Sequence, residues 1–222
     1  MLTPRLQCIA DHAGGGVIAD IGTDHAYIPI ELIGKNTAKR VIACDIKKGP
    51  LEIAAQNIKN HGLTGKIETR LGGGLSVLGT SEADMIIIAG MGGEMIKKIL
   101  REDEETARAA DLILQPMNSQ YELRKFLLSN GYKILDEDIA VEGTKVYNIM
   151  VVKSGKQDGF KTDIEYHIPR YLINHKYFKK LYEKKRREFT KVISGLENSK
   201  EPDTEKLNRY KFWLKELEKY EG

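Results

Sequence analysis

The sequence VIADIGTDHAYIPI, residues 17–30, decides the fold and marks an expected ligand site. Residues 17–21 form a short, mostly apolar run of the kind found in buried parallel strands. Gly22 follows this run, and because it has no side chain, it lets the backbone approach a ligand closely. Ligands of open α/β sheets lie outside the carboxyl ends of the strands, so we expect a ligand beside Gly22.

Strand and helix patterns alternate on either side of this stretch. Further strands are expected at residues 40–46, 66–71, 84–89 and 111–115, and helices at residues 26–33, 50–61, 93–100 and 121–128. Two last strands, at residues 132–140 and 145–152, have so short a connection that they must pair antiparallel. This order predicts an α/β fold, in which a Rossmann-like parallel sheet carries helices on both faces and ends in an antiparallel hairpin.

The pattern changes after a polar, glycine-containing linker at residues 155–159. Apolar residues at helical spacing run from Tyr171 to Leu196, if Asn174 or His175 and Lys185 are allowed into the stripe, and again from Leu207 to Leu217. Two such stripes predict an antiparallel helical hairpin of coiled-coil type. We therefore divide the chain into a Rossmann-like domain at residues 1–157 and a helical hairpin at residues 158–222.

Charge is distributed unevenly over these two parts. The 222 residues carry a net charge of +3, but residues 161–222 hold 16 Lys and Arg against 11 Asp and Glu. The basic residues gather at Lys179, Lys180, Lys184, Lys185, Arg186 and Arg187. Such a run is either a solvated helix face or the electrostatic footprint of a nucleic-acid-binding element.

Composition also argues against several other classes of protein. No run is long and apolar enough to span a membrane, and residues 1–5 lack the pattern of a signal peptide. The two cysteines, Cys8 and Cys44, have no paired spacing, which makes a disulfide or zinc site unexpected and favours a cytoplasmic location. Cys44 has no acid–base partner next to it in sequence, which argues against a catalytic thiol. The histidines at positions 12, 61, 167 and 175 show no ligand spacing and are expected to face solvent.

The ligand beside Gly22 is expected to contain adenosine but no phosphates. The stretch lacks the additional glycines that admit the pyrophosphate of a dinucleotide, and S-adenosylmethionine fits it better. Asp45, at the end of the second strand, suits the ribose hydroxyls, and Asp20 either binds the ammonium group through water or only caps a turn. Bare backbone at Gly73, Gly90, Met91 and Gly92 admits the cofactor or forms a tight turn.

These motifs, together with residues 88–93 and 112–116, resemble the bacterial tRNA (adenine(22)-N1)-methyltransferase family. The resemblance implies a class I S-adenosylmethionine-dependent methyltransferase domain, a C-terminal coiled-coil hairpin and tRNA as the partner. It implies that the cofactor site is lined by Asp20, Gly22, His25, Asp45 and the loop of Gly90, Met91 and Gly92. Many methyltransferases that act on amino nitrogens carry an Asn-Pro-Pro-aromatic tetrad after the fourth strand; this chain has Ala89-Gly90-Met91-Gly92 there.

The same resemblance implies that Asp24 and the turn of Gln115 and Pro116 face the target adenine. Adenine N1 has an in-plane lone pair, so direct in-line attack on the methyl group needs no prior deprotonation. We assign Asp24 the catalytic role of accepting a hydrogen bond from the exocyclic N6 and stabilising the charge that develops on the ring. Gln115 and Asn118 are expected to read the base edge and Tyr27 to stack on the base. His25 is either a general base or a residue that orients the cofactor, and the orienting role is favoured because attack by N1 needs no base.

Other functions remain open at this stage. A methyltransferase for another RNA, a protein or a small molecule could use the same cofactor residues. A non-catalytic tRNA-binding protein could retain the fold, whereas an NAD-dependent oxidoreductase is disfavoured by the missing glycines. We expect a monomer that binds tRNA and needs neither a metal nor a membrane.

Overall fold

The computed structural model describes residues 1–201 and 203–220 of the chain. It divides into two compact units, Met1–Gly159 and Phe160–Gly222, and each unit is described by itself.

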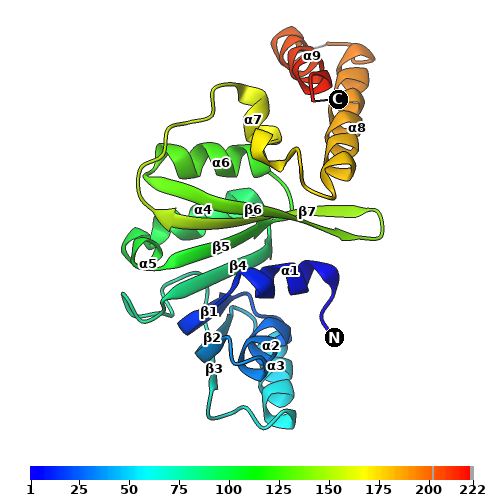
Figure 1. The fold of residues 1–222 in the computed structure, drawn as a ribbon. Helices are drawn as coiled ribbons and strands as arrows, with labels where there is room; N and C mark the ends of the chain where they lie inside the picture. The colour runs from blue at the N-terminus through cyan, green and yellow to red at the C-terminus, as the bar shows by residue number, and fades with distance from the viewer. Residues whose placement is uncertain (202, 221–222) are drawn as a thin grey trace. The chain divides into compact units, whose positions relative to one another are not determined.

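A seven-stranded sheet in the order β3-β2-β1-β4-β5-β7-β6 forms the centre of the first unit (Figure 1). Its strands are β1 (Gly15–Ile21), β2 (Ala38–Asp45), β3 (Ile67–Leu71), β4 (Met85–Met91), β5 (Asp111–Pro116), β6 (Tyr132–Glu142) and β7 (Lys145–Ser154). The first five strands are parallel, whereas β7 pairs antiparallel with both β5 and β6. The predicted α/β class, with its antiparallel hairpin at one end of the sheet, is confirmed.

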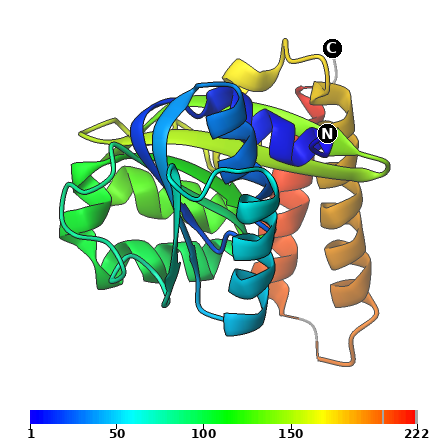
Figure 2. The ribbon, with the colours of Figure 1, turned by 90° about the horizontal axis from the view of Figure 1, so that it is seen from below.

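Six helices cover the two faces of this sheet (Figure 2). They are α1 (Pro4–His12), α2 (Tyr27–Gly34), α3 (Lys48–Asn60), α4 (Gly93–Glu102), α5 (Glu104–Ala109) and α6 (Gln120–Ser129). Buried residues of α1, α2 and α3 share one apolar cluster, and those of α4, α5 and α6 share the other. Helix α5 was not predicted; it is only six residues long and begins after Asp103, whose carboxylate accepts a bond from the Thr106 N–H.

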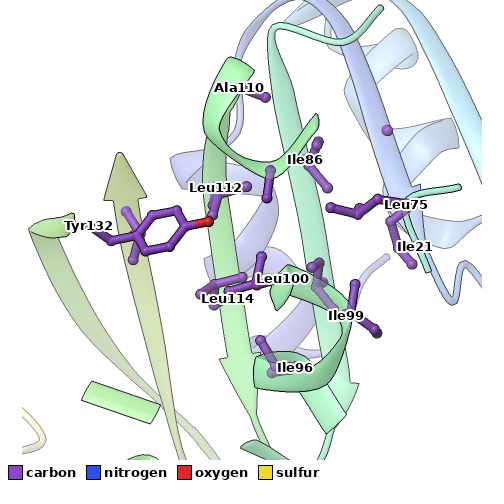
Figure 3. Close-up of a cluster of buried hydrophobic side chains, with 14 of the residues drawn as sticks. Ile21, Leu75, Ile86, Ile96, Ile99, Leu100, Ala110, Leu112, Leu114 and Tyr132 are labelled. Atoms are coloured by element: carbon purple, nitrogen blue, oxygen red, sulfur yellow. The ribbon is translucent and has the colours of Figure 1, made fainter. Parts of the chain in front are cut away.

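Alternate residues of the central strands supply the two apolar clusters. Ile87 and Ile113 point toward α1–α3, whereas Ile86, Ile88, Leu112 and Leu114 pack against α4–α6 (Figure 3). Because parallel strands are buried on both faces, their sequences read as continuous apolar runs. This burial fixes the register of the strands and therefore fixes where the loops after them lie.

The second unit consists of α7 (Asp163–His167), a 3₁₀ turn η1 (Arg170–Leu172), α8 (Phe178–Glu197) and α9 (Thr204–Glu218). Helices α8 and α9 lie side by side (Figure 2), as the predicted hairpin requires. The chain turns at residues 173–177, so α8 begins seven residues after Tyr171, which is 52% exposed. The placement of Tyr171 in the helical stripe was therefore wrong.

His167 of α7 packs into an aromatic cluster of the second unit. Its ring centroid lies 4.9 Å from that of Phe189 on α8 and 4.5 Å from that of Trp213 on α9. The side chain is 7% exposed, so the expectation that His167 faces solvent was wrong. The short α7 buries this ring because α8 and α9 each contribute an aromatic side chain to surround it.

Candidate active site

The carboxyl ends of four parallel strands meet at one edge of the sheet, which we call the strand-end edge. In the register, Ile21 pairs with Cys44, Asp45 with Leu71, and Met91 with Pro116. The loops that follow β1, β2, β4 and β5 therefore lie next to one another, as expected for a ligand site of an open α/β sheet. These loops carry most of the site residues that were expected from the sequence.

The loop after β1 is tightly constrained. The N–H groups of Gly22 and Thr23 both donate to the Cys44 carbonyl, at 2.8 and 2.9 Å. Asp24 and Ala26 adopt left-handed backbone conformations, with φ of 53° and 58°. Such conformations cost about 1–3 kcal/mol for residues other than glycine and persist where surrounding contacts impose them. This strained turn aims the side chain of Asp24 outward, where it is 67% exposed.

Asp45 is held in place at the end of β2. Its Oδ1 accepts a hydrogen bond from the Lys47 N–H at 2.8 Å, and its Oδ2 accepts one from the Asp24 N–H at 3.3 Å. The residue is 9% exposed. Two backbone donors therefore orient the carboxylate, which retains acceptor capacity for a further ligand.

Asp20 lies one residue before the end of β1 and is 4% exposed. Burial raises the pKa of its carboxyl to about 6; the hydrogen bond from the Thr23 hydroxyl, at 2.7 Å, opposes the shift and the charge of Asp45 adds to it. Thr23 was not among the predicted site residues. A buried acid with one hydroxyl partner is prepared to receive a cation, as the proposed ammonium contact requires.

Asp20→Asn should therefore stabilise the free protein, and the effect should grow with pH. The raised pKa means that the folded state binds the Asp20 proton more tightly than the unfolded state does. The stabilisation that the wild type gains from this proton is complete below about pH 4 and is lost as pH rises through 6. At neutral pH the variant should be more stable than the wild type by about 2 kcal/mol. Urea denaturation at about pH 4.5 and pH 7.5 measures the difference.

The exposed Asp11→Asn on α1 serves as the control for this comparison. Its stability relative to the wild type should not change between the two pH values. An equal difference for Asp20→Asn at both pH values would contradict the assignment of the pKa.

His25 and Tyr27 extend the strand-end edge. The Nδ1 atom of His25 is buried and has no hydrogen-bond partner among the described residues, while its Nε2 lies 3.5 Å from Asp24 Oδ1. The His25 carbonyl accepts a hydrogen bond from the Asn57 side chain at 3.1 Å. The Tyr27 ring lies 5.3 Å from the imidazole and is half exposed. An unpaired buried nitrogen is costly and points to a ligand here.

Close packing of the loops after β1, β4 and β5 requires glycines. A Cβ atom at Gly22 would lie 2.6 Å from Met91 Cε, and one at Gly93 would lie 2.7 Å from the Ser119 carbonyl oxygen. At Gly92 a Cβ atom would lie 3.1 Å from Asn118 Oδ1. These contacts are with protein atoms and support the tight-turn explanation; approach of the cofactor to this backbone stays a prediction.

Gln115 has a different environment from the one expected of a base-reading residue. Its side chain is fully buried, and its Oε1 accepts hydrogen bonds from the Gly90 N–H at 3.1 Å and from Arg5 Nη1 at 2.8 Å. Gln115 thus supports the Gly90 backbone and presents no surface to a base in this structure. Arg5, which comes from α1, was missed because only the fold brings it near residue 115.

Cys44 is unsuited to nucleophilic chemistry. Burial, more than any nearby charge, raises the pKa of its thiol to about 12, so the sulfur stays protonated at neutral pH. This environment agrees with the sequence, which argued against a catalytic thiol.

Comparisons with known proteins identify the family. A methyltransferase-domain family model matches residues 2–150. The chain is 38% identical over 159 residues to the tRNA (adenine(22)-N(1))-methyltransferase of Bacillus subtilis, covering 71% of this chain and 67% of that protein. The chain belongs to the tRNA (adenine(22)-N1)-methyltransferase family. The resemblance seen in the sequence is therefore confirmed.

Solved structures of this family match both units of the chain. The B. subtilis m1A22 tRNA methyltransferase TrmK has a TM-score of 0.88 at 30% identity, covering 99% of this chain and 98% of that chain. Streptococcus pneumoniae Sp1610 in complex with S-adenosyl-L-methionine has a TM-score of 0.87 at 31% identity, covering 99% of both chains.

The predicted tRNA-binding residues of this methyltransferase lie on α8 with unequal exposure. Lys179, Lys180, Arg186 and Arg187 are exposed, and Lys184 is partly buried. Lys185 is 6% exposed, and its Nζ lies 2.8 Å from Glu188 Oε2. The expectation that Lys185 contacts RNA phosphates is therefore not met in this structure, because Lys185 falls on the inward face of the helix.

Among the described residues, no helix combines the length and apolarity needed to cross a membrane.

Proposed function

We propose that this family member transfers a methyl group from S-adenosylmethionine to N1 of adenine 22 in tRNA. Family membership supports the choice of substrate. The arrangement of side chains at the strand-end edge supports the proposed chemistry. There, the oriented carboxylate of Asp45 and the buried carboxylate of Asp20 flank the glycine-containing loop after β1.

The residues at this edge fit S-adenosylmethionine. Asp45 would accept hydrogen bonds from the ribose hydroxyls, and Asp20 would compensate the ammonium charge, directly or through water. Ile46 is 71% exposed beside Asp45, and its Cδ1 packs so closely on Gly73 that a Cβ atom there would lie 2.9 Å away. This exposed apolar side chain suits the flat face of an adenine ring. When bound, S-adenosylmethionine supplies an electrophilic methyl group.

His25 and the loop after β4 complete the proposed cofactor site. The unpaired Nδ1 of His25 offers a hydrogen bond to the cofactor, which matches the orienting role expected of this residue. Gly90, Met91 and Gly92 would place nearly bare backbone beside the methionine end.

Methyl transfer to adenine N1 requires the protein to align the reacting atoms and does not require a general base. The N1 lone pair lies in the ring plane and is free when the base is unpaired or flipped out of its helix. Orientation of the reacting groups can lower the activation free energy by about 7–11 kcal/mol in favourable cases. The exposed Asp24 carboxylate would accept a hydrogen bond from N6 and stabilise the positive charge on the methylated ring. Tyr27 would stack on the base and Asn118 would contact its edge.

Radiolabelled methyl uptake tests the proposed reaction. The full chain should label unmodified tRNA, and should label neither a bulk protein extract nor a small-molecule extract. Labelling of protein, of small molecules or of other RNA alone would favour one of the other methyltransferase functions. Binding of S-adenosylmethionine without any transfer would favour a non-catalytic tRNA-binding protein.

The second unit is proposed to bind the phosphate backbone of tRNA. Four exposed cations of α8 form what we call the basic face: Lys179, Lys180, Arg186 and Arg187. Contacts of this kind neutralise phosphates without reading sequence and weaken as salt rises. We further propose that the protein acts as a monomer in the cytoplasm, where its substrate occurs.

Replacing the four residues of the basic face with glutamine should weaken tRNA binding about tenfold or more at moderate salt. The slope of log K against log salt should fall by about 0.7–0.9 for each phosphate that the variant no longer neutralises. Lys59→Gln combined with Lys66→Gln, two exposed positions of the first unit, provides the matched control. Filter binding over a salt series measures both quantities, and unchanged tRNA affinity with an unchanged slope would remove α8 from recognition.

A further inference from the structure

A cluster of metal-binding side chains lies where α1 contacts β6. Cys8 and His12 are four residues apart on α1, which places them on the same face of the helix. Asp138 extends from β6 toward this face. One ligand atom from each of these three residues lies within 4.8 Å of the other two, and all three side chains are partly buried.

The geometry is close to that of a tetrahedral zinc site. His12 Nε2 lies 3.0 Å from Asp138 Oδ2. Bond lengths of 2.0–2.3 Å place the ligand atoms of tetrahedral zinc about 3.3–3.6 Å apart. The three ligand atoms here lie within 4.8 Å of one another, which is close to that spacing. Asp136 Oδ2 lies 3.9 Å from the other imidazole nitrogen, Nδ1 of His12. A carboxylate on the distal nitrogen of a ligating histidine is a frequent feature of zinc sites.

The chemistry of the three ligands favours zinc among the common divalent ions. Magnesium and calcium prefer oxygen ligands, whereas a thiolate and an imidazole together select softer ions such as zinc. The thiolate of Cys8 and the carboxylate of Asp138 would balance the two charges of the ion. Cys8 forms no disulfide, so its sulfur is not committed to a covalent bond with another cysteine.

We propose that Cys8, His12 and Asp138 bind one zinc ion, with a water molecule as the fourth ligand and the Asp136 carboxylate 3.9 Å from the distal nitrogen of His12. The ion would fasten the end of α1 to β6. The start of α1 is already fastened, because the Arg5 N–H donates to Glu142 Oε1 at 2.8 Å. Arg5, at the start of α1, also donates to Gln115, which in turn accepts a hydrogen bond from the Gly90 N–H. A zinc ion at the other end of α1 would therefore help to hold the helix that supports the loop after β4.

No metal was expected from the sequence, because the two cysteines have no paired spacing and the histidines have no ligand spacing among themselves. The spacing of Cys8 and His12 was a signal, since residues four apart on a helix can bind one ion. Asp138 could not be linked to them from sequence, because the pairing of α1 with β6 depends on the fold.

Cobalt titration of the untagged, reduced and metal-free full chain tests the proposal. One equivalent of Co²⁺ should produce a thiolate-to-cobalt charge-transfer band, and Zn²⁺ should displace it. Cys8→Ser should abolish this band, while His12→Ala and Asp138→Asn should weaken binding of both ions by at least about tenfold. Asp136→Asn should weaken binding less than His12→Ala does, because the Asp136 carboxylate lies 3.9 Å from Nδ1 of His12, beyond hydrogen-bond range.

Cys44→Ala and His61→Ala are the matched controls, because neither residue belongs to the cluster. Both should keep the wild-type band and affinity, and circular dichroism of the metal-free variants checks that each is folded. Absence of the band in the wild type, or its persistence in folded Cys8→Ser, would overturn the proposal and leave an ion pair of His12 with the aspartates. Should Cys8→Ser not fold, the wild-type cobalt spectrum alone decides between these results.

Discussion

Asp24→Ala is expected to lower the rate of tRNA methylation about 10²–10³-fold, the usual cost of losing one electrostatic contact to a transition state. The exposed Asp24 carboxylate is the group proposed to accept the N6 hydrogen bond and stabilise the methylated ring. It lies outside the set of carboxylates proposed for the cofactor, so affinity for S-adenosylmethionine should change little. Single-turnover kinetics with saturating tRNA, together with calorimetry for the cofactor, separate the two effects.

Asp24→Asn refines this experiment. The left-handed backbone at Asp24 is tolerated better by asparagine than by alanine, so this variant removes the charge without adding strain. It should retain a hydrogen-bond acceptor and lose less activity than Asp24→Ala. The exposed Glu52→Ala on α3 should behave as the wild type. Methylation by Asp24→Ala within about tenfold of the wild type would show that Asp24 is not catalytic.

Glu137→Ala is expected to destabilise the protein by about 3–5 kcal/mol, the usual cost of breaking a buried ion pair. Arg124 on α6 donates to Glu137 on β6 through Nε at 2.9 Å and Nη2 at 2.6 Å, and both side chains have no exposed surface. In the variant, the buried guanidinium of Arg124 loses its bidentate partner at a position that is not exposed to solvent, and the folded state is destabilised. Urea denaturation at neutral pH measures the loss.

The double variant Arg124→Met with Glu137→Leu is the control for that loss. Replacing both charges by apolar groups of similar size removes the penalty of an unpaired charge, so most of the stability should return. Glu104→Ala, which breaks an exposed pair with Arg108, should cost less than about 1 kcal/mol. A similar decrease in the free energy of unfolding for Glu137→Ala and Glu104→Ala would contradict the prediction that breaking the buried ion pair costs more than breaking the exposed one.

The fold could be predicted because its elements have distinct local patterns. The parallel strands are buried on both faces, so runs such as residues 84–89 are unmistakably apolar, and helices such as α3 carry one apolar stripe. Short elements escape this reasoning. Helix α5 contains only six residues. The break before α8 lies between Tyr171 and Phe178, where the helical spacing is continued only by the polar Asn174 or His175.

The candidate site could be predicted only in part. Asp45 and Gly22 are recognisable because residues at strand ends have a position fixed by the sheet. The hydrogen bond of Arg5 to Gln115 joins residues 110 positions apart, so neither that bond nor the full burial of Gln115 could be read from local sequence. Lys185 belongs both to the basic run and to the apolar stripe of the predicted helix, and these two patterns give opposite predictions for its side chain. The structure agrees with the stripe, because Lys185 is buried with the apolar residues of α8.

Methylation at N1 of adenine 22 is tested by locating the new methyl group in the tRNA product. Unmodified tRNA should be methylated by the full chain, digested and examined for 1-methyladenosine by mass spectrometry. Because N1 lies on the Watson–Crick edge, reverse transcription of the intact product should stop at position 22. A transcript with guanine at this position should neither gain the methyl group nor cause the stop. Methyl transfer to N6, to another nucleotide, or to no tRNA at all would contradict the account.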